Sequence, residues 1–283
     1  MKPSSFLKNL VNYTMFAVTG ICTVIAVGIL FFILGYLVYN GGKSLSLSFF
    51  TNLPVPVGEI GGGMANAIVG SGKVLLLATL IGIPIGFLGG VYLSEYSNEQ
   101  VAFTIRYVTD LLNGVPSIVI GIVVYAIAVH PVGHYSTFAG GIALGIMMIP
   151  ISVRSTEEFL RAVPQSLREA ALALGAPKWK SIVTVVIPAA MRGIISGTML
   201  DVARVAGETA PLLFTALGNQ YWSPGWNQPA ATLPVMIYRY AISPYDDWRR
   251  QAWAAGFVLL ALVLLINIVA RMALSRGMYV PKG

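Results

Sequence analysis

The chain has 283 residues, of which 56% are hydrophobic and 10% are charged, and its formal net charge is +7. Ordinary soluble domains are about 45–50% apolar and about 25% charged, so this composition excludes a typical water-soluble domain. The positive charge does not indicate a nucleic-acid partner, because the basic residues are scattered between apolar runs and form no stripe. The composition favours an all-α integral membrane protein.

Six apolar runs are candidates for helices that cross a lipid bilayer, a crossing that needs about 20 residues. The first run exceeds the apolar core of a signal peptide, about 7–15 residues, so we expect it to remain as the first membrane helix. The third is interrupted by Gly114 and Pro116, and the fourth is short with Pro150 near its end. Both are candidates for bent or broken helices that line a pathway. The expected helices cover residues 15–39, 67–93, 107–129, 138–153, 194–217 and 252–273.

The second run is rich in small residues, a pattern that lets membrane helices approach each other closely. We therefore expect it to be a packed interior helix. The residues that form this pattern are Gly82, Pro84, Gly86, Gly89 and Gly90.

The distribution of basic residues predicts the orientation, since Lys and Arg are enriched in cytoplasmic loops. With a cytoplasmic N-terminus, twelve of them fall inside and four outside, so we expect a multi-pass protein of the cell (inner) membrane with both termini in the cytoplasm. The inside set is Lys2, Lys8, Arg106, Arg154, Arg161, Arg168, Lys178, Lys180, Arg192, Arg271, Arg276 and Lys282, and the outside set is Lys43, Arg239, Arg249 and Arg250.

The long internal loop expected at residues 154–192 contains the signals of a short docking helix. Pro164 suits a first helical position, and Gly175 followed by Pro177 suits a helix end, so we expect a helix over residues 164–174. One face of this helix is apolar. That face is formed by Leu167, Ala171 and Leu174.

The same loop resembles the EAA loop of ABC importer permeases. Glu169-Ala170-Ala171 is followed by Gly175 and later by Ile187-Pro188, a reduced form of the family's I-x-L-P ending. In that family the loop forms a coupling helix seated on the ATPase subunit, and the resemblance implies this role here. A helix lying on the membrane surface is the alternative that amphipathicity alone leaves open.

The fifth run contains charged residues within an otherwise apolar stretch. Asp201, Arg204 and Glu208 are spaced three and four apart, so we expect them on one helical face, neutralising one another. Ionisable side chains in a membrane span avoid lipid and face protein or a watery path. The Arg fork suits an oxyanion, with Thr209 adding a hydroxyl. A buried pair that only fixes helix packing is the alternative.

Three motifs together resemble the membrane subunits of phosphate ABC importers, over nearly the whole chain. A further segment, from Leu233-Pro234 to Ser243-Pro244-Tyr245, looks like the A-type subunit of that family. The resemblance implies a type I ABC importer permease fold (MetI-like) and a pathway role for Arg204 and Glu208, with Asp201 and Thr209 beside them. The three motifs are Leu112-Asn-Gly-Val-Pro-Ser117, Val153-Arg-Ser-Thr-Glu-Glu158 and Arg204-Val-Ala-Gly-Glu-Thr-Ala-Pro-Leu-Leu-Phe-Thr215.

The resemblance also implies partners and a domain organisation. The expected partners are a C-type permease subunit, two ATP-binding subunits, an external phosphate-binding protein and the lipid bilayer. Residues 1–65 would hold the first helix and an external loop, residues 66–272 the permease domain, and residues 273–283 a cytoplasmic tail. Glu169, Ala170, Ala171 and Gly175 would form the ATPase contact.

Other chemistries are disfavoured by the sequence. Gly70-Ser71-Gly72-Lys73 lacks the remaining residues of a nucleotide-binding loop, so ATP hydrolysis is expected from a separate subunit. His130 and His134 are separated by Pro131 and Gly133, which argues against a helical metal site. We expect no catalytic site, metal or cofactor. A permease for another small anion, or a secondary anion transporter, remains the alternative function.

Overall fold

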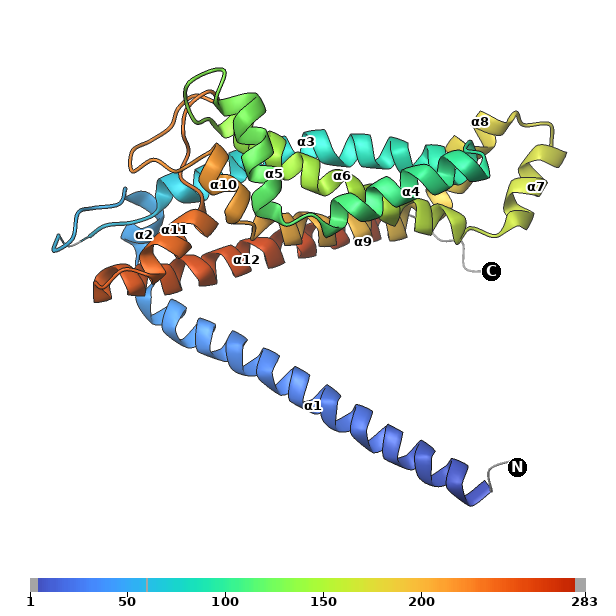
Figure 1. The fold of residues 1–283 in the computed structure, drawn as a ribbon, viewed down its shortest axis with the longest axis horizontal. Coiled ribbons are helices and arrows are strands. Elements are labelled where there is room, and N and C mark those ends of the chain that lie inside the picture. The colour runs from blue at the N-terminus through green and yellow to red at the C-terminus, as the bar shows by residue number, and fades with distance from the viewer. Residues whose placement is uncertain (1–4, 60, 278–283) are drawn as a thin grey trace.

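The computed structural model describes residues 5–59 and 61–277, and all regular structure in them is helical. The long helices α3, α6, α9 and α12 run side by side along the longest axis of the molecule, and α1 leaves them at an angle (Figure 1). The elements are α1 (Ser5–Ser44), α2 (Leu47–Thr51), α3 (Ala65–Glu95), α4 (Glu99–Gly114), α5 (Ser117–Val124), the π-helix η1 (Tyr125–Val129), α6 (Thr137–Arg161), α7 (Gln165–Ala173), α8 (Lys178–Ser181), the π-helix η2 (Ile182–Val186), α9 (Ile187–Ala206), α10 (Ala210–Thr215), α11 (Leu233–Ala241) and α12 (Asp246–Gly277).

The expectation of about six membrane crossings is confirmed. Five helical spans are long and apolar enough to cross a bilayer, and α4 together with α5 and η1 forms a sixth if the pair is one bent span. The two halves of that pair meet at an angle of 97° beside Pro116, so the predicted break in the third run is confirmed. The predicted break in the fourth run is wrong, because α6 continues through Pro150 without interruption.

Several helices extend beyond their apolar cores. Residues 154–161 belong to α6, and Lys178–Ala206 is one helical span, so the loop that carries α7 is shorter than the expected 154–192. Hydropathy detects only the part of a helix that lies in the hydrocarbon layer, whereas the helix continues through polar residues outside it. The fifth helix also ends early: α9 stops at Ala206, and α10 is a separate helix within the expected 194–217.

Glycines allow α3 and α6 to pack closely, as the small-residue pattern predicted. A Cβ atom on Gly82 would lie 2.5 Å from Met148 Cβ, and one on Gly90 would lie 2.5 Å from Thr156 Cβ. These distances are far inside van der Waals contact, so only glycine fits at either position. A glycine of α6 likewise makes room for a side chain of α3, because a Cβ on Gly141 would lie 2.5 Å from Leu77 Cβ. The two helices therefore form an interlocked central pair.

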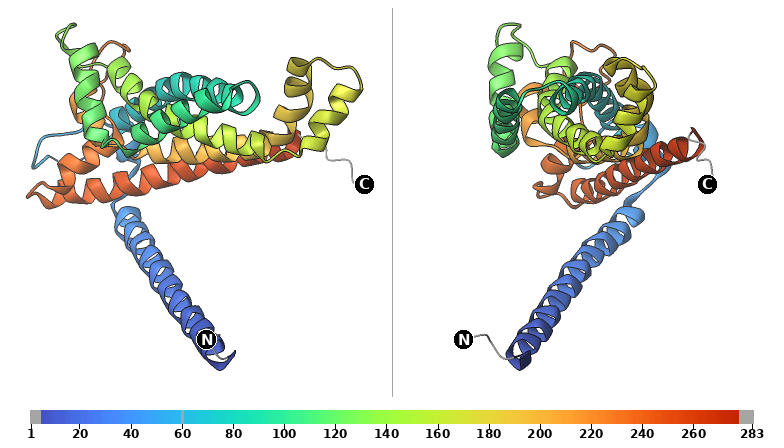
Figure 2. Two further views of the ribbon diagram at one scale, coloured as in Figure 1. Left: turned by 45° about the vertical axis from the view of Figure 1, so that its right-hand side comes forward. Right: turned by 90° about the vertical axis from the view of Figure 1, so that its right-hand side faces the viewer.

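The α1 helix is separate from this bundle along most of its length (Figure 2). It touches α12 near its C-terminal end, where the Tyr36 and Trp253 rings meet edge to face at 5.2 Å. A Cβ on Gly41 would lie 2.5 Å from Phe257 Cβ, so the crossing is tight. The apolar window of α1 is 0% buried within this chain, which leaves its surface for lipid or for another subunit.

Residues 218–251, which follow α10 and reach into the start of α12, are folded onto one end of the bundle. Within it, α11 buries Leu233, Val235 and Met236 in the core. The Tyr240 and Trp248 rings stack at 4.5 Å and join α11 to the start of α12. The segment is therefore a packed cap.

The two ends of the bundle differ in what they carry. The α7 and α8 helices lie at one end, while α2 and α11 lie at the other (Figure 1). The start of α1 and the end of α12 both point toward the end that carries α7. Of the residues used to predict orientation, Lys2, Lys282 and the Arg276 side chain lie outside the described part of the chain.

The glycine packing makes a paired prediction. Gly82→Ala forces a Cβ into Met148 and the Gly145 carbonyl, so we expect it to lower the free energy of unfolding by about 1–3 kcal/mol through overpacking. Gly72→Ala on the same helix introduces a Cβ that meets no atom within 4 Å. Because alanine is a better helix former than glycine, this variant should raise the free energy of unfolding by about 0.5–1 kcal/mol. Thermal unfolding in detergent measures both, and equal midpoints for the two variants would contradict this packing.

Candidate functional site

Two helix breaks face each other in the middle of the bundle. The first lies between α4 and α5, where Val115 and Pro116 have extended backbone conformations. The second lies between α9 and α10, where Gly207, Glu208 and Thr209 separate the two helices. The α5 and α10 helices pack against each other, since a Cβ on Gly121 would lie 2.6 Å from Pro211 Cα. Irregular backbone at membrane depth is typical of protein surfaces that line a cavity.

A cavity of about 220 Å³ lies between the two breaks. Arg204 from the end of α9 is exposed to it, and Glu208 from the second break is half-buried. Asn113 and Ser117 add polar side chains from the first break. Since Ser117 is the first residue of α5, the free N–H groups of that helix end also lie at this wall. The complete lining is Leu112, Asn113, Val115, Pro116, Ser117, Ile120, Met147, Ile151, Arg204, Val205 and Glu208.

The expectation that all three of Asp201, Arg204 and Glu208 share one helical face is wrong, although Asp201 and Arg204 do lie three residues apart in α9. The α9 helix ends at Ala206, so Glu208 lies beyond it and is no longer positioned by helical spacing. Among the described residues no ion pair joins any two of the three. Two of the three, Arg204 and Glu208, are brought together at the cavity.

Asp201 lies apart from the cavity lining. Its exposed fraction is 1%, and neither carboxylate oxygen has a hydrogen-bond partner among the described residues. Thr209 also does not line the cavity, and its side chain makes no capping hydrogen bond to α10. Its backbone carbonyl instead accepts from Leu212 and Leu213, in the first turn of α10.

A network of ion pairs joins α4 to α6 next to this cavity, and the sequence did not single it out. Glu157 is only 3% exposed. It accepts from Arg106 Nε at 2.8 Å and Nη2 at 2.5 Å, and it pairs with Arg154 at 3.8 Å and Arg161 at 3.6 Å. Arg154 also pairs with Asp110 of α4. The local signals were the i, i+4 spacing of Arg106 and Asp110 and the spacing of Glu157 from Arg154 and Arg161, whereas the contacts between α4 and α6 join residues far apart in sequence.

The predicted docking helix is present as α7, and most of it is exposed. Glu169 and Ala170 are exposed, whereas Ala171 is buried. Gly175 has a φ of +81°, the left-handed conformation that glycine adopts at helix ends, and its amide donates to Leu172. The expected apolar face is only partly covered, because the exposed fractions of Leu167 and Leu174 are 43% and 89%.

Arg168 ties the base of α7 to the bundle. Its guanidinium donates to Glu95 Oε1 at 2.9 Å, to the Leu160 carbonyl at 2.7 Å and to the Val163 carbonyl at 2.5 Å. The Arg168 and Glu95 side chains are only 16% and 6% exposed. The exposed helix is therefore fixed to the ends of α3 and α6.

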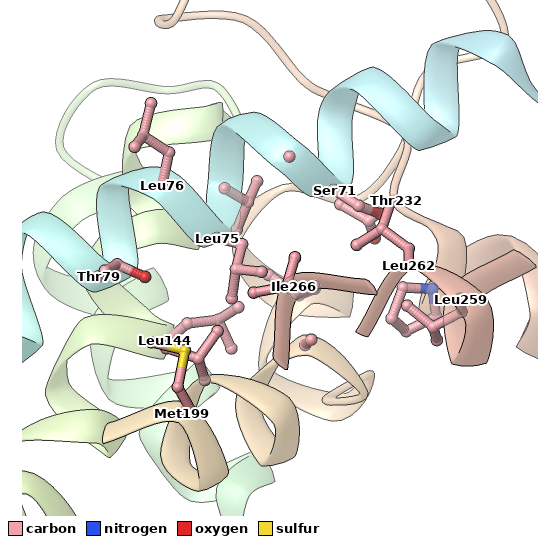
Figure 3. Close-up of a pocket in the computed structure, with 16 residues that line it drawn as sticks. Ser71, Leu75, Leu76, Thr79, Leu144, Met199, Thr232, Leu259, Leu262 and Ile266 are labelled. Atoms are coloured by element: carbon pink, nitrogen blue, oxygen red, sulfur yellow. The ribbon is translucent and has the colours of Figure 1, made fainter. Parts of the chain in front are cut away.

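A second, larger cavity of about 290 Å³ is apolar and does not include Arg204. Side chains from α3, α6, α9 and α12 converge on it, among them Leu75, Leu144, Met199 and Ile266 (Figure 3). Among the described residues, its only polar side chains are the hydroxyls of Ser71, Thr79 and Thr232, and no charged residue lines it, so it offers an anion no positive charge.

Comparison with known proteins shows the family. Residues 82–276 match the family model described as "Binding-protein-dependent transport system inner membrane component". The chain is 46% identical over 248 residues to the "Phosphate transport system permease protein PstA" of Yersinia pestis, which covers 87% of this chain and 84% of that protein. It is 44% identical over 265 residues to the protein of the same name from Pasteurella multocida, covering 93% and 94% of the two chains.

Solved structures show the same fold at low sequence identity. A chain of the MetNI methionine ABC transporter, in an inward-facing conformation, has a TM-score of 0.63 at 20% identity, with 76% of this chain and 98% of that chain covered. A chain of a bacterial ABC transporter for import of the polysaccharide alginate has a TM-score of 0.57 at 16% identity and covers 96% and 97%. With these matches and its helical spans, the chain is a multi-pass membrane protein that belongs to the binding-protein-dependent transport system inner membrane components and, within them, to the PstA group of permeases.

Proposed function

We propose that this chain is the membrane-spanning permease subunit of an ATP-driven ABC importer, and that it carries inorganic phosphate toward the cytoplasm. The observation that carries the proposal is the polar cavity between the two helix breaks, with Arg204 at its wall. A guanidinium in a membrane-spanning segment is costly unless it serves a watery path or a ligand. The arrangement suits a path for a small anion.

The cavity provides several donors for the oxygens of such an anion. Arg204 presents a planar fork that binds two oxygens at once, and the first turn of α5 presents backbone N–H groups at Ser117. The Asn113 amide adds further donors. The Glu208 carboxylate lies in the same cavity and repels a bound anion. This repulsion lowers the affinity of the site, so the anion can be released.

Phosphate as the cargo is supported by the relatives, which are named for phosphate transport and match nearly the full chain. Asp201 and Thr209 have supporting roles in this proposal. Asp201 lies in the packed interior of α9, one turn from Arg204, and contributes to the field around the guanidinium. Thr209 holds the start of α10, which forms part of the second break.

A second permease subunit, of C-type, would complete the path. Arg204 is exposed on this chain although it belongs to a membrane span, so another protein surface must cover it to keep it away from lipid. The exposed surface of α1 is available for the same partner and for the bilayer. An external phosphate-binding protein would deliver the anion to the end that carries α2 and α11.

Two ATP-binding subunits would dock at the opposite end, with one of them on α7. The exposed Glu169 and Ala170 would form the contact, and Ala171 and Gly175 would set the position and exit angle of the helix. Both termini would lie in the cytoplasm, because the start of α1 and the end of α12 point toward the α7 end.

The pathway role of Arg204 is tested with Arg204→Gln in the co-expressed transporter, reconstituted in vesicles. We expect ATP-driven phosphate uptake to fall at least about 100-fold, since two charge-assisted hydrogen bonds of about 1.5 kcal/mol or more each are lost. Subunit assembly, measured by co-purification, should be unchanged. The matched control is Arg192→Gln, an exposed arginine three turns earlier in α9.

Wild-type uptake by Arg204→Gln would exclude the pathway role. Uptake by the wild type that persists without ATP would identify a secondary transporter instead, and stronger inhibition by another small anion than by phosphate would identify a different cargo.

The docking role of α7 is tested with Glu169→Lys, which reverses an exposed charge on that helix. We expect the ATP-binding subunit to be lost from pull-downs, or its affinity to fall at least about tenfold, the effect of a lost interfacial charge contact of about 1.5 kcal/mol. Glu158→Lys makes the same charge change on an exposed residue of α6 and should leave the association intact. Equal association of the two variants would contradict docking on α7.

A further inference from the structure

The ion pair between Asp110 and Arg154 lies directly beyond the cavity, on the side of α7. On α4, Asp110 is three residues from Asn113, and on α6, Arg154 is three residues from Ile151. Each spacing is about one helical turn, or about 4.5 Å along the axis. Both displacements run toward the end that carries α7, because α6 leads into the α7 loop and α4 runs antiparallel to it. An anion that leaves the cavity in that direction meets this pair next.

The Arg154 guanidinium binds the Asp110 carboxylate through two hydrogen bonds, like the prongs of a fork, a geometry that also suits other oxyanions. Arg154 donates from Nε to Asp110 Oδ1 at 3.0 Å and from Nη2 to Asp110 Oδ2 at 2.5 Å. Two parallel hydrogen bonds of this kind fit a carboxylate and a phosphate equally well. The Asp110 side chain is 55% exposed and that of Arg154 is 38% exposed, so the bond between them is reachable by solvent and by a competing anion.

The second carboxylate of the network, that of Glu157, is buried, whereas that of Asp110 is exposed. Its side chain is only 4% exposed and is held by Arg106 through two hydrogen bonds, with Arg154 and Arg161 within 4 Å. A buried carboxylate with these partners stays in place, because its displacement would leave buried charges uncompensated. An incoming anion therefore exchanges with Asp110 rather than with Glu157.

The charge of the cluster favours such an exchange. Arg106, Arg154 and Arg161 carry three positive charges, and Asp110 and Glu157 carry two negative charges, so one positive charge is in excess. With Asp110 turned away, Arg154 is free to bind a divalent or monovalent oxyanion. With Asp110 in place, the guanidinium is occupied and the carboxylate repels anions that approach the exit.

We propose that Arg154 is a second anion-binding residue on the exit side of the path, and that Asp110 closes this exit by occupying the Arg154 guanidinium until phosphate displaces it. This inference rests on the proposed anion transport and extends it to the inner half of the path. An exposed ion pair contributes little free energy, so phosphate that replaces the Asp110 carboxylate at Arg154 is bound only weakly. The phosphate can therefore leave.

The first test removes the competing carboxylate. In vesicles that contain the assembled transporter and are loaded with phosphate, Asp110→Asn should raise passive phosphate efflux without ATP by about fivefold, the factor for an exposed pair of about 1 kcal/mol. The control is Asp246→Asn, an exposed aspartate that pairs with Arg249 at the opposite end of the helices. Efflux equal to that of the wild type overturns the exit role of Asp110.

The second test removes the fork. Arg154→Gln should lower the maximal rate of ATP-driven uptake by about tenfold, the effect of one lost charge-assisted hydrogen bond, while the phosphate concentration for half-maximal uptake stays unchanged. Arg154→Lys keeps the charge without the fork and should restore part of the rate. Co-purification of the subunits checks that each variant assembles.

The two variants also separate this proposal from a purely structural pair. Both substitutions remove the pair between Arg154 and Asp110, and Arg154→Gln also removes the 3.8 Å contact with Glu157. If the pair only fastens α4 to α6, the two variants must therefore change each flux in the same direction. The proposal instead requires a raised passive efflux for Asp110→Asn and a lowered driven uptake for Arg154→Gln. If the wild type takes up phosphate with ATP but the two variants change the fluxes alike, only the inference about Arg154 and Asp110 is wrong. If the wild type takes up no phosphate, the proposed function itself is wrong.

Discussion

The glycine-lined contact between α3 and α6 supports every other part of this structure. Without side chains at Gly82 and Gly90, the two helices approach until Met148 and Thr156 touch the opposite backbone. In the membrane there is little hydrophobic driving force between helices, so close van der Waals contact of this kind supplies the association. The α6 helix is thereby held in the centre, with α9 on one side and α4 and α5 on another.

The central position of α6 explains why one helix contributes to three different features. Met147 and Ile151 line the polar cavity, Arg154 and Glu157 form the ion-pair network one turn further on, and the helix ends directly before the α7 loop. The Arg168 hydrogen bonds tie α7 to the ends of α3 and α6. The proposed coupling helix, the proposed exit and the cavity are therefore all connected to α6.

Burial divides the charged residues of these features into two groups. Glu157 and Glu95 are enclosed by arginines and keep the frame together, since removing either would leave uncompensated buried charge. Arg204, which lines the cavity, and Asp110, one turn beyond the lining residue Asn113, are exposed. A transport path needs both kinds, because its walls must hold still while the charges that meet the cargo must exchange.

The sequence by itself determined the membrane class, about six spans, the docking helix ending at Gly175 and the break beside Pro116. Each of these depends on neighbouring residues, whose hydropathy, helix signals and backbone restrictions act locally. Only the tertiary structure decided that α6 passes Pro150 unbroken, that the residues around α11 fold back as a cap, and that Asp201 lies outside the cavity that Arg204 and Glu208 line. It also brought Arg106 and Asp110 to Glu157 and Arg154, which are more than forty residues away in the chain. Contacts of this kind depend on how closely two helices can pack, and the spacing of residues within one helix carries no information about its partner's register.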